Sequence, residues 1–406
     1  MMNLSAYPDY AVPVEGYLGR VFPTSADELN PFKKDKKRIL LSKIFQYLTG
    51  KAQVDIAQYN DAAINRFSHT IQVAFYATEI AQELGLNIDL VEAMALLHDI
   101  GHPAFGHIGE DILGDITEHH QQSRFNHNVF GAVYVGSIAK RNVKNNPFGF
   151  NLSKETMHAM FKNMEIRERF KSLFINPDTN GILHRTGEDQ LVDTADSDMY
   201  TLMDLSQAIR MKLPGCSIEE LSQFQLIATA QEYAEKNNLE LHEALYEILK
   251  QDLIENSRPK LEARNSFKEL QAKDITVICH SDAVQKDLKA INKYLDEKWY
   301  NNKKKDKRRD DAAATLQMIF DKLLKKPTEK TDAIRDRLNQ MVEEENYWLP
   351  LLLKEGQKPE DLNTEVWAPA IQIARLTDRK LLELADVLEL NVPLKPITTI
   401  LPELKE

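Results

Sequence analysis

Apolar residues recur at helical spacing along most of the chain, and few stretches alternate in the way that half-buried strands do. The clearest helical patterns cover residues 66–84 and 90–97. A further pattern begins at residue 35 and continues to 48, and a long one covers 188–213. The strongest strand signal, residues 275–278, is short. The pattern therefore predicts an all-α protein.

The ends of the 90–97 segment carry residues that start and stop helices. We expect Asp89 to cap its first turn, with Glu92 three residues later in a capping-box arrangement. Gly101 and Pro103 are expected to end the helix just after His98-Asp99. These two side chains would then lie at the negative end of the helix dipole, which favours a bound cation.

The composition is that of a globular protein with an acidic surface. The chain has 406 residues, 43% of them apolar, and a net charge of −11, which disfavours a dedicated nucleic-acid binder. Its two cysteines lie far apart in sequence and indicate a reducing compartment. We see no secretory signal pattern and no apolar run of membrane-spanning length, so we predict a cytoplasmic protein without a membrane partner.

One charged run departs from this acidic balance. Residues 303–309 are strongly basic. Such a run is typical of a solvated loop, with an anion-binding edge as the alternative interpretation.

Histidines are concentrated in one part of the chain. Seven of the eleven lie between His69 and His127, and residues 98–110 combine several of them with Asp99 and Glu110. A histidine followed by an aspartate is common on surfaces, and two ligands on one helix are too few for a metal site. Other ligands would have to come from elsewhere in the fold.

The spaced elements Asn65-Arg66-Phe67-Ser68-His69, His98-Asp99 and Ala195-Asp196 resemble those of the HD-domain phosphohydrolases. Within that superfamily the chain is most similar to the deoxynucleoside triphosphate triphosphohydrolases, the dGTPase-like enzymes. Four further segments carry this closer resemblance, while 216–360 is covered only by general helical character. Those segments are 35–54, 101–110, 195–204 and, more weakly, 374–379.

The resemblance implies an all-α HD-domain helical bundle with additional C-terminal helices. Its parts would be an N-terminal arm (1–34), the HD catalytic core (35–215) and a helical C-terminal part packed on the core (216–406). The implied metal ligands are His69, His98, Asp99 and Asp196. Two imidazoles and two carboxylates suit a single divalent ion of borderline softness, such as Fe²⁺, Co²⁺, Ni²⁺ or Zn²⁺. The family favours Mn²⁺ or Mg²⁺.

By the same resemblance, His107 and Glu110 are the catalytic pair. A carboxylate three residues after an imidazole can hydrogen-bond to it and fix its tautomer. Whether His107 acts as acid or base stays open, and the alternative is that Glu110 caps a helix while His107 packs.

The resemblance also assigns the substrate contacts. Arg66, His102 and His127 would contact phosphate, as cationic or polar donors do. The sugar would be contacted by Gln53, Tyr200 and Asp204, which share a role in excluding a 2′-hydroxyl; Tyr200 could instead be a core residue. Ser197 stands where some relatives have a lysine, which leaves one phosphate contact open.

The resulting hypothesis is a metal-dependent hydrolase that converts a dNTP and water into a deoxynucleoside and tripolyphosphate. Two alternatives remain: an HD phosphohydrolase acting on a nucleoside monophosphate, cyclic nucleotide or alarmone, and a nucleotide-sensing protein whose HD site is a relic. The resemblance further implies a homo-oligomer, with an allosteric nucleotide or single-stranded DNA as candidate regulators. The preferred base is not predicted.

Overall fold

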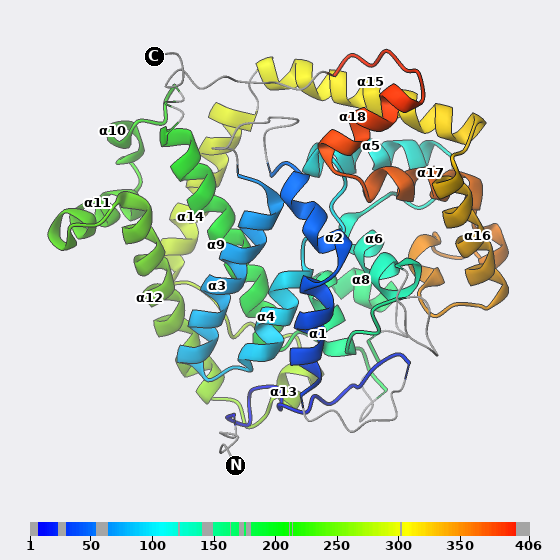
Figure 1. Ribbon diagram of the computed structural model, residues 1–406. Helices are drawn as coiled ribbons and strands as arrows, with labels where there is room; N and C mark the ends of the chain where they lie inside the picture. The colour runs from blue at the N-terminus through cyan, green and yellow to red at the C-terminus, as the bar shows by residue number, and fades with distance from the viewer. Residues whose placement is uncertain are drawn as a thin grey trace. The chain divides into compact units, whose positions relative to one another are not determined.

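The computed structural model describes residues 7–22, 30–53, 64–120, 122–139, 149–162, 164–169, 174–175, 180–210, 212, 214–300 and 303–394 (Figure 1). Within these ranges the chain forms eighteen α-helices joined by turns and short 3₁₀ or π segments. The only β-type pairings in the same ranges are three isolated bridges. The predicted all-α class is confirmed. None of the described helices is long and apolar enough to span a bilayer.

The chain divides into two compact units, and each unit is assembled from three separate segments. Unit 1 consists of Met1–Tyr17, Gln72–Ala95 and Ile175–Asp306, and unit 2 of Leu18–Ile71, Leu96–Phe174 and Lys307–Glu406. The division into arm, core and C-terminal part follows sequence order instead, and it stays a prediction.

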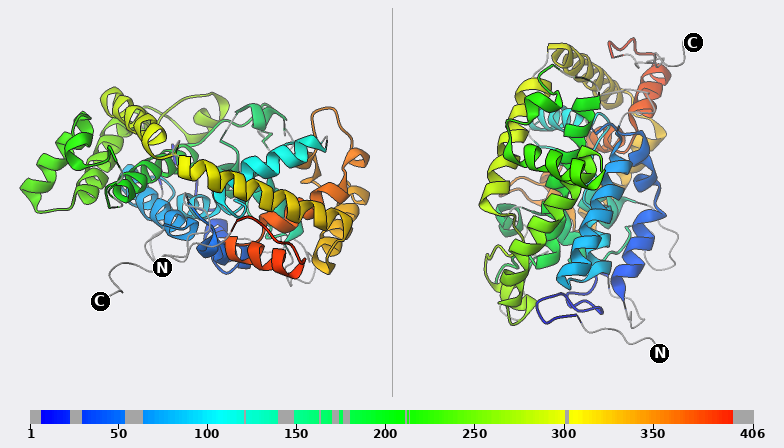
Figure 2. Two further views of the ribbon diagram at one scale, coloured as in Figure 1. Left: turned by 90° about the horizontal axis from the view of Figure 1, so that it is seen from above. Right: turned by 90° about the vertical axis from the view of Figure 1, so that its left-hand side faces the viewer.

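Unit 1 is built around the long helix α9, which packs against α12 and α14, while α11 packs against α12 (Figures 1 and 2). The three helices α3 (Arg66–Leu84), α4 (Ile88–Leu97) and α15 (Lys303–Lys325) contribute residues to both units. The helices that lie wholly in unit 1 are α9 (Gly187–Arg210), α10 (Ile218–Leu221), α11 (Gln225–Asn237), α12 (Leu241–Glu262), α13 (Phe267–Ala272) and α14 (Asp282–Leu295).

Unit 2 holds the N-terminal helices and the C-terminal ones together. Helix α16 packs along α17, and α17 also contacts α5. Its complete helices are α1 (Pro31–Leu40), α2 (Lys43–Gln46), α5 (Gly106–His119), α6 (His127–Val133), α7 (Lys154–Met157), α8 (Met164–Arg169), α16 (Glu329–Glu343), α17 (Thr364–Ala374) and α18 (Asp378–Val387).

A charged cluster is buried in unit 1 between α9, α12 and the start of α14. His280 lies between two carboxylates, with its Nε2 2.9 Å from Asp198 and its Nδ1 2.8 Å from Asp252. The Tyr76 hydroxyl donates to Asp198 at 3.1 Å. Burial lowers the pKa of His280, but the two aspartates outweigh it and raise that pKa to about 9. The imidazolium therefore joins α9, α12 and the start of α14 inside unit 1.

Helix α3 has the bounds that its apolar stripe predicts, but the start of α4 differs from the expectation. The helix begins at Ile88, so Asp89 lies inside its first turn. Asn87 provides the cap instead, because its Oδ1 accepts a hydrogen bond from the backbone N–H of Leu90 at 3.1 Å. Asparagine is as good a capping residue as aspartate, and here its own side-chain amide also donates to the carbonyl of Val12.

Two further segments differ from their predictions. The basic run 303–309 is not a loop; it forms the start of α15. The apolar segment 275–278 has no regular secondary structure and pairs with no strand among the described residues. One side chain contacts its backbone at both ends, since Gln190 accepts from the N–H of Val277 at 2.9 Å and donates to the carbonyl of Ile275 at 2.9 Å.

Candidate active site

Four elements of unit 2 converge on one group of polar side chains. Arg66 and His69 lie three residues apart at the start of α3, so they share a face. His98 and Asp99 follow the last turn of α4. The turn after them carries His102 and leads into α5, and α6 opens nearby. The local sequence explains this arrangement, because glycines and Pro103 end α4 and start α5 within a few residues.

The metal-type donors of this group are His69, His98 and Asp99. One potential ligand atom from each lies within 4.8 Å of the others, and all three side chains are buried. The His69 and His98 rings meet edge to face, with centroids 5.7 Å apart. Two imidazoles and a carboxylate at this separation fit a divalent ion of the borderline class, so the donor chemistry agrees with the expected metal. The structure brings together three of the four predicted ligands.

Asp99 lies within contact distance of the basic side chains Arg66 and His102. Its Oδ2 accepts from Arg66 Nη1 at 2.7 Å, and its Oδ1 is 3.2 Å from His102 Nε2. Burial raises the pKa of Asp99, but His98, Arg66 and His102 outweigh it and hold that pKa well below its usual range. Burial, with Arg66 nearby, holds the pKa of His102 well below its usual value. The site therefore pairs an ionised carboxylate with a neutral imidazole.

Glu110 on α5 has two histidine neighbours. The predicted partner, His107, has its Nδ1 3.5 Å from Glu110 Oε2. His127 is closer, because both its backbone N–H and its Nδ1 lie within 2.9 Å of Glu110. Burial raises the pKa of Glu110, but hydrogen bonds from the two histidines outweigh it and keep that pKa well below its usual range. Glu110 therefore orients a second imidazole that the sequence interpretation had not linked to it.

Close backbone contact fixes the turn against α6. A side chain at Gly101 would come 1.9 Å from the carbonyl oxygen of His127 and 2.6 Å from the backbone nitrogen of Gly131. Only glycine fits there. The His102 and His127 rings consequently stack, with centroids 3.7 Å apart.

Several buried polar atoms around this cluster have no hydrogen-bond partner among the described residues. They are Nε and Nη2 of Arg66, Nδ1 of His102 and Oε1 of Gln53. Buried polar atoms are nearly always paired in a folded protein, and exceptions need an explanation. A bound ligand rich in donors and acceptors would supply the missing partners.

The remaining predicted residues lie on α9. Asp196, Tyr200 and Asp204 are separated by four residues each within one uninterrupted helix, so they share a face as the sequence implied. Asp204 is buried, and Asp196 and Tyr200 are partly exposed. They belong to unit 1, and their roles stay predictions.

Two residues that the sequence interpretation left without a role touch the turn. Lys51 donates from Nζ to the carbonyl oxygen of His102, and Asp378 accepts from the backbone N–H of Phe105 at 2.9 Å. Both lie in segments that carried the family resemblance, which was the available signal. Their contact with the turn depends on the fold and could not be inferred from spacing.

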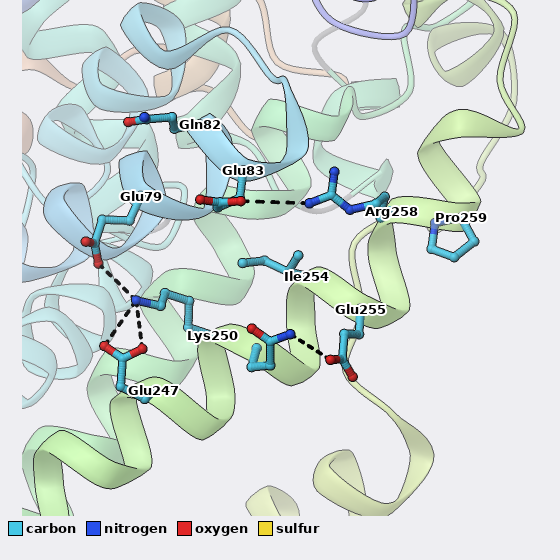
Figure 3. A pocket seen from close by; sticks show the side chains of 10 residues that line it. Glu79, Gln82, Glu83, Glu247, Lys250, Ile254, Glu255, Arg258 and Pro259 are labelled. Carbon is cyan, nitrogen blue, oxygen red and sulfur yellow. Dashed lines mark hydrogen bonds and ion pairs between the residues drawn. The ribbon is translucent and has the colours of Figure 1, made fainter. Parts of the chain in front are cut away.

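A separate groove of about 730 Å³ lies between α3 and α12 in unit 1 (Figure 3). Glutamates, glutamines and two cations line it. Lys250 bridges Glu79 at 3.7 Å and Glu247 at 2.9 Å, and Arg258 lies 4.0 Å from Glu83. Among the described residues, no histidine or cysteine lines this groove, so it lacks the ligand chemistry of the unit 2 cluster.

The all-helical fold and the histidine–aspartate cluster define a class of protein, the HD-domain proteins. Residues 66–197 match the HD domain family. They include the four predicted metal ligands and the catalytic pair.

Whole-chain comparisons narrow the class. A deoxyguanosinetriphosphate triphosphohydrolase-like protein of Ruegeria sp. (strain TM1040) is 30% identical over 313 residues, which cover 72% of this chain and 80% of the relative. A protein of the same description from Cereibacter sphaeroides (strain ATCC 17025 / ATH 2.4.3) is 30% identical over 76% of this chain and 85% of its own. One from Pelagibacter ubique (strain HTCC1062) is 28% identical over 80% and 91%. The chain belongs to the family of deoxyguanosinetriphosphate triphosphohydrolase-like proteins, and it is a phosphohydrolase.

Proposed function

We propose that this protein is a metal-dependent dNTP triphosphohydrolase that converts a dNTP and water into a deoxynucleoside and tripolyphosphate. The observation that carries the proposal is the cluster in unit 2. There the metal-binding side chains adjoin buried nitrogen atoms of Arg66 and His102 that have no hydrogen-bond partner among the described residues. The names of the relatives support the substrate class. The relatives named above are at most 30% identical, so the base is left open.

The metal would be held by His69, His98 and Asp99, with Asp196 as the proposed fourth ligand. A bound divalent ion supplies Lewis acidity toward a phosphoryl oxygen and lowers the pKa of bound water. Mn²⁺ and Mg²⁺ are the favoured candidates for the single ion. Arg66 would orient the Asp99 carboxylate, since it already donates to Oδ2 at 2.7 Å.

The triphosphate would be bound by Arg66, His102 and His127. Arg66 uses Nη1 for Asp99 and keeps Nε and Nη2 for an anion, which suits a phosphate oxygen. Gln53 carries a buried oxygen that has no hydrogen-bond partner among the described residues, as a sugar hydroxyl would require. Tyr200 and Asp204 are the proposed walls that exclude a 2′-hydroxyl.

Proton transfer falls to His107. Its ring is 57% exposed, so it is accessible, and Glu110 faces its Nδ1, which leaves Nε2 to hold or release the proton. Water attacks the α-phosphorus, the bond from phosphorus to the 5′ oxygen breaks, and that oxygen leaves with a proton as the deoxynucleoside hydroxyl. The oxygen of the water ends on tripolyphosphate.

The test is product analysis with purified protein. Each dNTP and NTP would be incubated with Mn²⁺ or Mg²⁺ in ¹⁸O-labelled water. The products would then be separated and their molecular masses measured by mass spectrometry. We expect a deoxynucleoside, and tripolyphosphate that carries the label. A dNMP with pyrophosphate, turnover of cyclic nucleotides or alarmones, or no turnover at all would each refute the proposal.

One pocket in unit 2 is a candidate regulatory binding site. A pocket of about 850 Å³ is bounded by α1, α2 and α16, and no acidic side chain among the described residues lines it. Tyr47, Tyr134 and Phe150 add aromatic surface, so the pocket suits a phosphorylated aromatic molecule, and we assign the proposed allosteric nucleotide to it. Its basic residues are Lys34, Lys37, Arg38, Lys43, Lys330, Arg337 and Arg375.

Charge reversal at Lys37 and Lys43, which are both exposed, would test this assignment. The double variant should lose any activation by a second nucleotide and keep its unstimulated rate. Light scattering would establish whether the protein is the homo-oligomer that the family resemblance implies.

A further inference from the structure

The turn between α4 and α5 has a backbone conformation that its surroundings must hold. Phe105, the residue before α5, adopts a left-handed conformation with φ of 66° and is buried. A bulky residue in this region is strained and persists only where neighbouring structure fixes it. The turn carries His102 and sets the first turn of α5, on which His107 lies.

Two buried side chains from distant parts of unit 2 hold this turn. Lys51 is 1% exposed, and its Nζ donates to the carbonyl oxygens of His102 and, at 3.0 Å, Ala374. Asp378 is 4% exposed, and its Oδ1 accepts from the N–H of Phe105 at 2.9 Å. One side chain therefore fixes a carbonyl near the start of the turn, and the other fixes an amide at its end.

The backbone around these two contacts is tightly packed. A side chain on Gly50 would come 2.8 Å from Cβ of Thr377, and one on Gly106 would come 2.9 Å from the carbonyl oxygen of Ala52. Residues 50–52 are thus confined between the start of α18 on one side and the turn on the other. Such a segment cannot shift without moving its neighbours.

The charges of the pair also depend on each other. Burial lowers the pKa of Lys51 to about 7, and the Asp378 carboxylate opposes that shift. A buried charge without such a partner would be costly.

We propose that Lys51 and Asp378 are positioning residues for the phosphohydrolase reaction, which fix the turn so that His102 and His107 are correctly aimed. They act through these histidines and do not touch the substrate. The inference rests on the proposed function for the identity of the reaction, but the contacts themselves are independent of which nucleotide is hydrolysed.

Asp378 offers a sharp test because two substitutions separate its roles. Asp378→Asn keeps an oxygen that can accept from Phe105, whereas Asp378→Leu removes it at similar volume. Misplacement of catalytic groups by about 1 Å can cost roughly 100-fold in rate. We expect kcat to fall at least about 10-fold in Asp378→Leu and less than about 3-fold in Asp378→Asn, with KM and metal content unchanged. Asp386→Leu, an exposed site on the same helix, is the matched control.

A double-variant cycle distinguishes a positioning role of Asp378 from a merely structural one. In a double-variant cycle with His107→Ala, Asp378→Leu should cost far less than in the wild type, because the group it positions is already gone. The proposal would be overturned if kcat of the double variant fell by the full product of the two single-variant losses. It would also be overturned if folded, metal-loaded Asp378→Leu had the same kcat as the wild type. Lys51→Met should lower kcat in the same way as Asp378→Leu.

The assay would use whichever nucleotide the wild type hydrolyses fastest. The ratios of kcat between variants and wild type can then be interpreted even if the substrate differs from the one proposed. Amide exchange gives a readout without turnover. The N–H of Phe105 should exchange faster in Asp378→Leu than in Asp378→Asn or the control. Equal exchange in all of them would refute the positioning role even if no nucleotide is hydrolysed.

Discussion

Replacing His280 by Gln should weaken unit 1 in a way that depends on pH. The imidazole lies between Asp198 and Asp252, with Tyr76 and the backbone N–H of Ser281 completing the group. The two carboxylates raise the pKa of His280 from 6.5 to about 9. Because the folded pKa lies above the unfolded one, this stabilisation is fully present below about pH 6.5 and is lost as pH rises through about 9.

The size of the effect follows from the shift. Each pKa unit corresponds to about 1.4 kcal/mol, so the pH-dependent part is on the order of 3 kcal/mol. The difference in unfolding free energy between wild type and His280→Gln should therefore be largest at pH 6 and shrink by about that amount by pH 9.5. Tyr76 does not interfere, because burial and the adjacent Asp198 raise its pKa well above its usual value.

The measurement is urea unfolding, followed by circular dichroism at several pH values between 6 and 9.5. His242→Gln is the matched control, because His242 is an exposed residue on α12, the helix that carries Asp252. A free-energy difference between wild type and His280→Gln that stays constant across this range would refute the reasoning. So would a His242→Gln variant with the same pH dependence.

Three other predictions concern the proposed metal ligands, the catalytic histidine and the turn after α4. His98→Ala and Asp196→Asn should each lose the metal and the activity together, because both are proposed ligands; full metal occupancy by elemental analysis would remove that residue from the set. His107→Ala should keep metal and nucleotide binding while kcat falls about 10²–10⁴-fold, the usual loss for a positioned acid or base; weaker binding with unchanged turnover would make it a binding residue. Gly101→Ala should lower the unfolding free energy by about 3 kcal/mol or more, since the new methyl would overlap the His127 carbonyl. For Gly114→Ala the three nearest atoms all belong to the flexible Arg124 side chain, so it should have a smaller effect in the same denaturation assay.

Spacing in the sequence was sufficient to predict what lies within one helix or one turn. The apolar stripe of α3 predicted its bounds. The three donors that the structure brings together, His69, His98 and Asp99, were implied by the family resemblance and not by spacing alone. Local signals failed where two residues competed for one role. Asn87 and Asp89 are both good helix caps, and the choice between them depends on the contact of Asn87 with Val12, which is distant in sequence.

Contacts between distant segments could not be predicted from one sequence. Lys51 and Asp378 are 327 positions apart, and both hold the same turn. The partnership of Glu110 with His127 likewise depends on where α6 lies, while the pair at His107 was visible as a spacing of three. Gln190 illustrates the same limit, because its amide replaces the strand partner that 275–278 would otherwise need.

The segmented make-up of unit 2 has a consequence for how the protein is synthesised. The cluster-bearing segments 18–71 and 96–174 leave the ribosome well before Lys307–Glu406, yet all three segments form one compact unit. Until the last of them emerges, α5 lacks its neighbour α17, and the turn at Phe105 lacks Asp378. The nascent chain must therefore carry an unfinished site through the synthesis of some 130 residues of unit 1, Ile175–Asp306. Truncated products that end within that stretch should be clients for chaperones and proteases, and should have no partial activity.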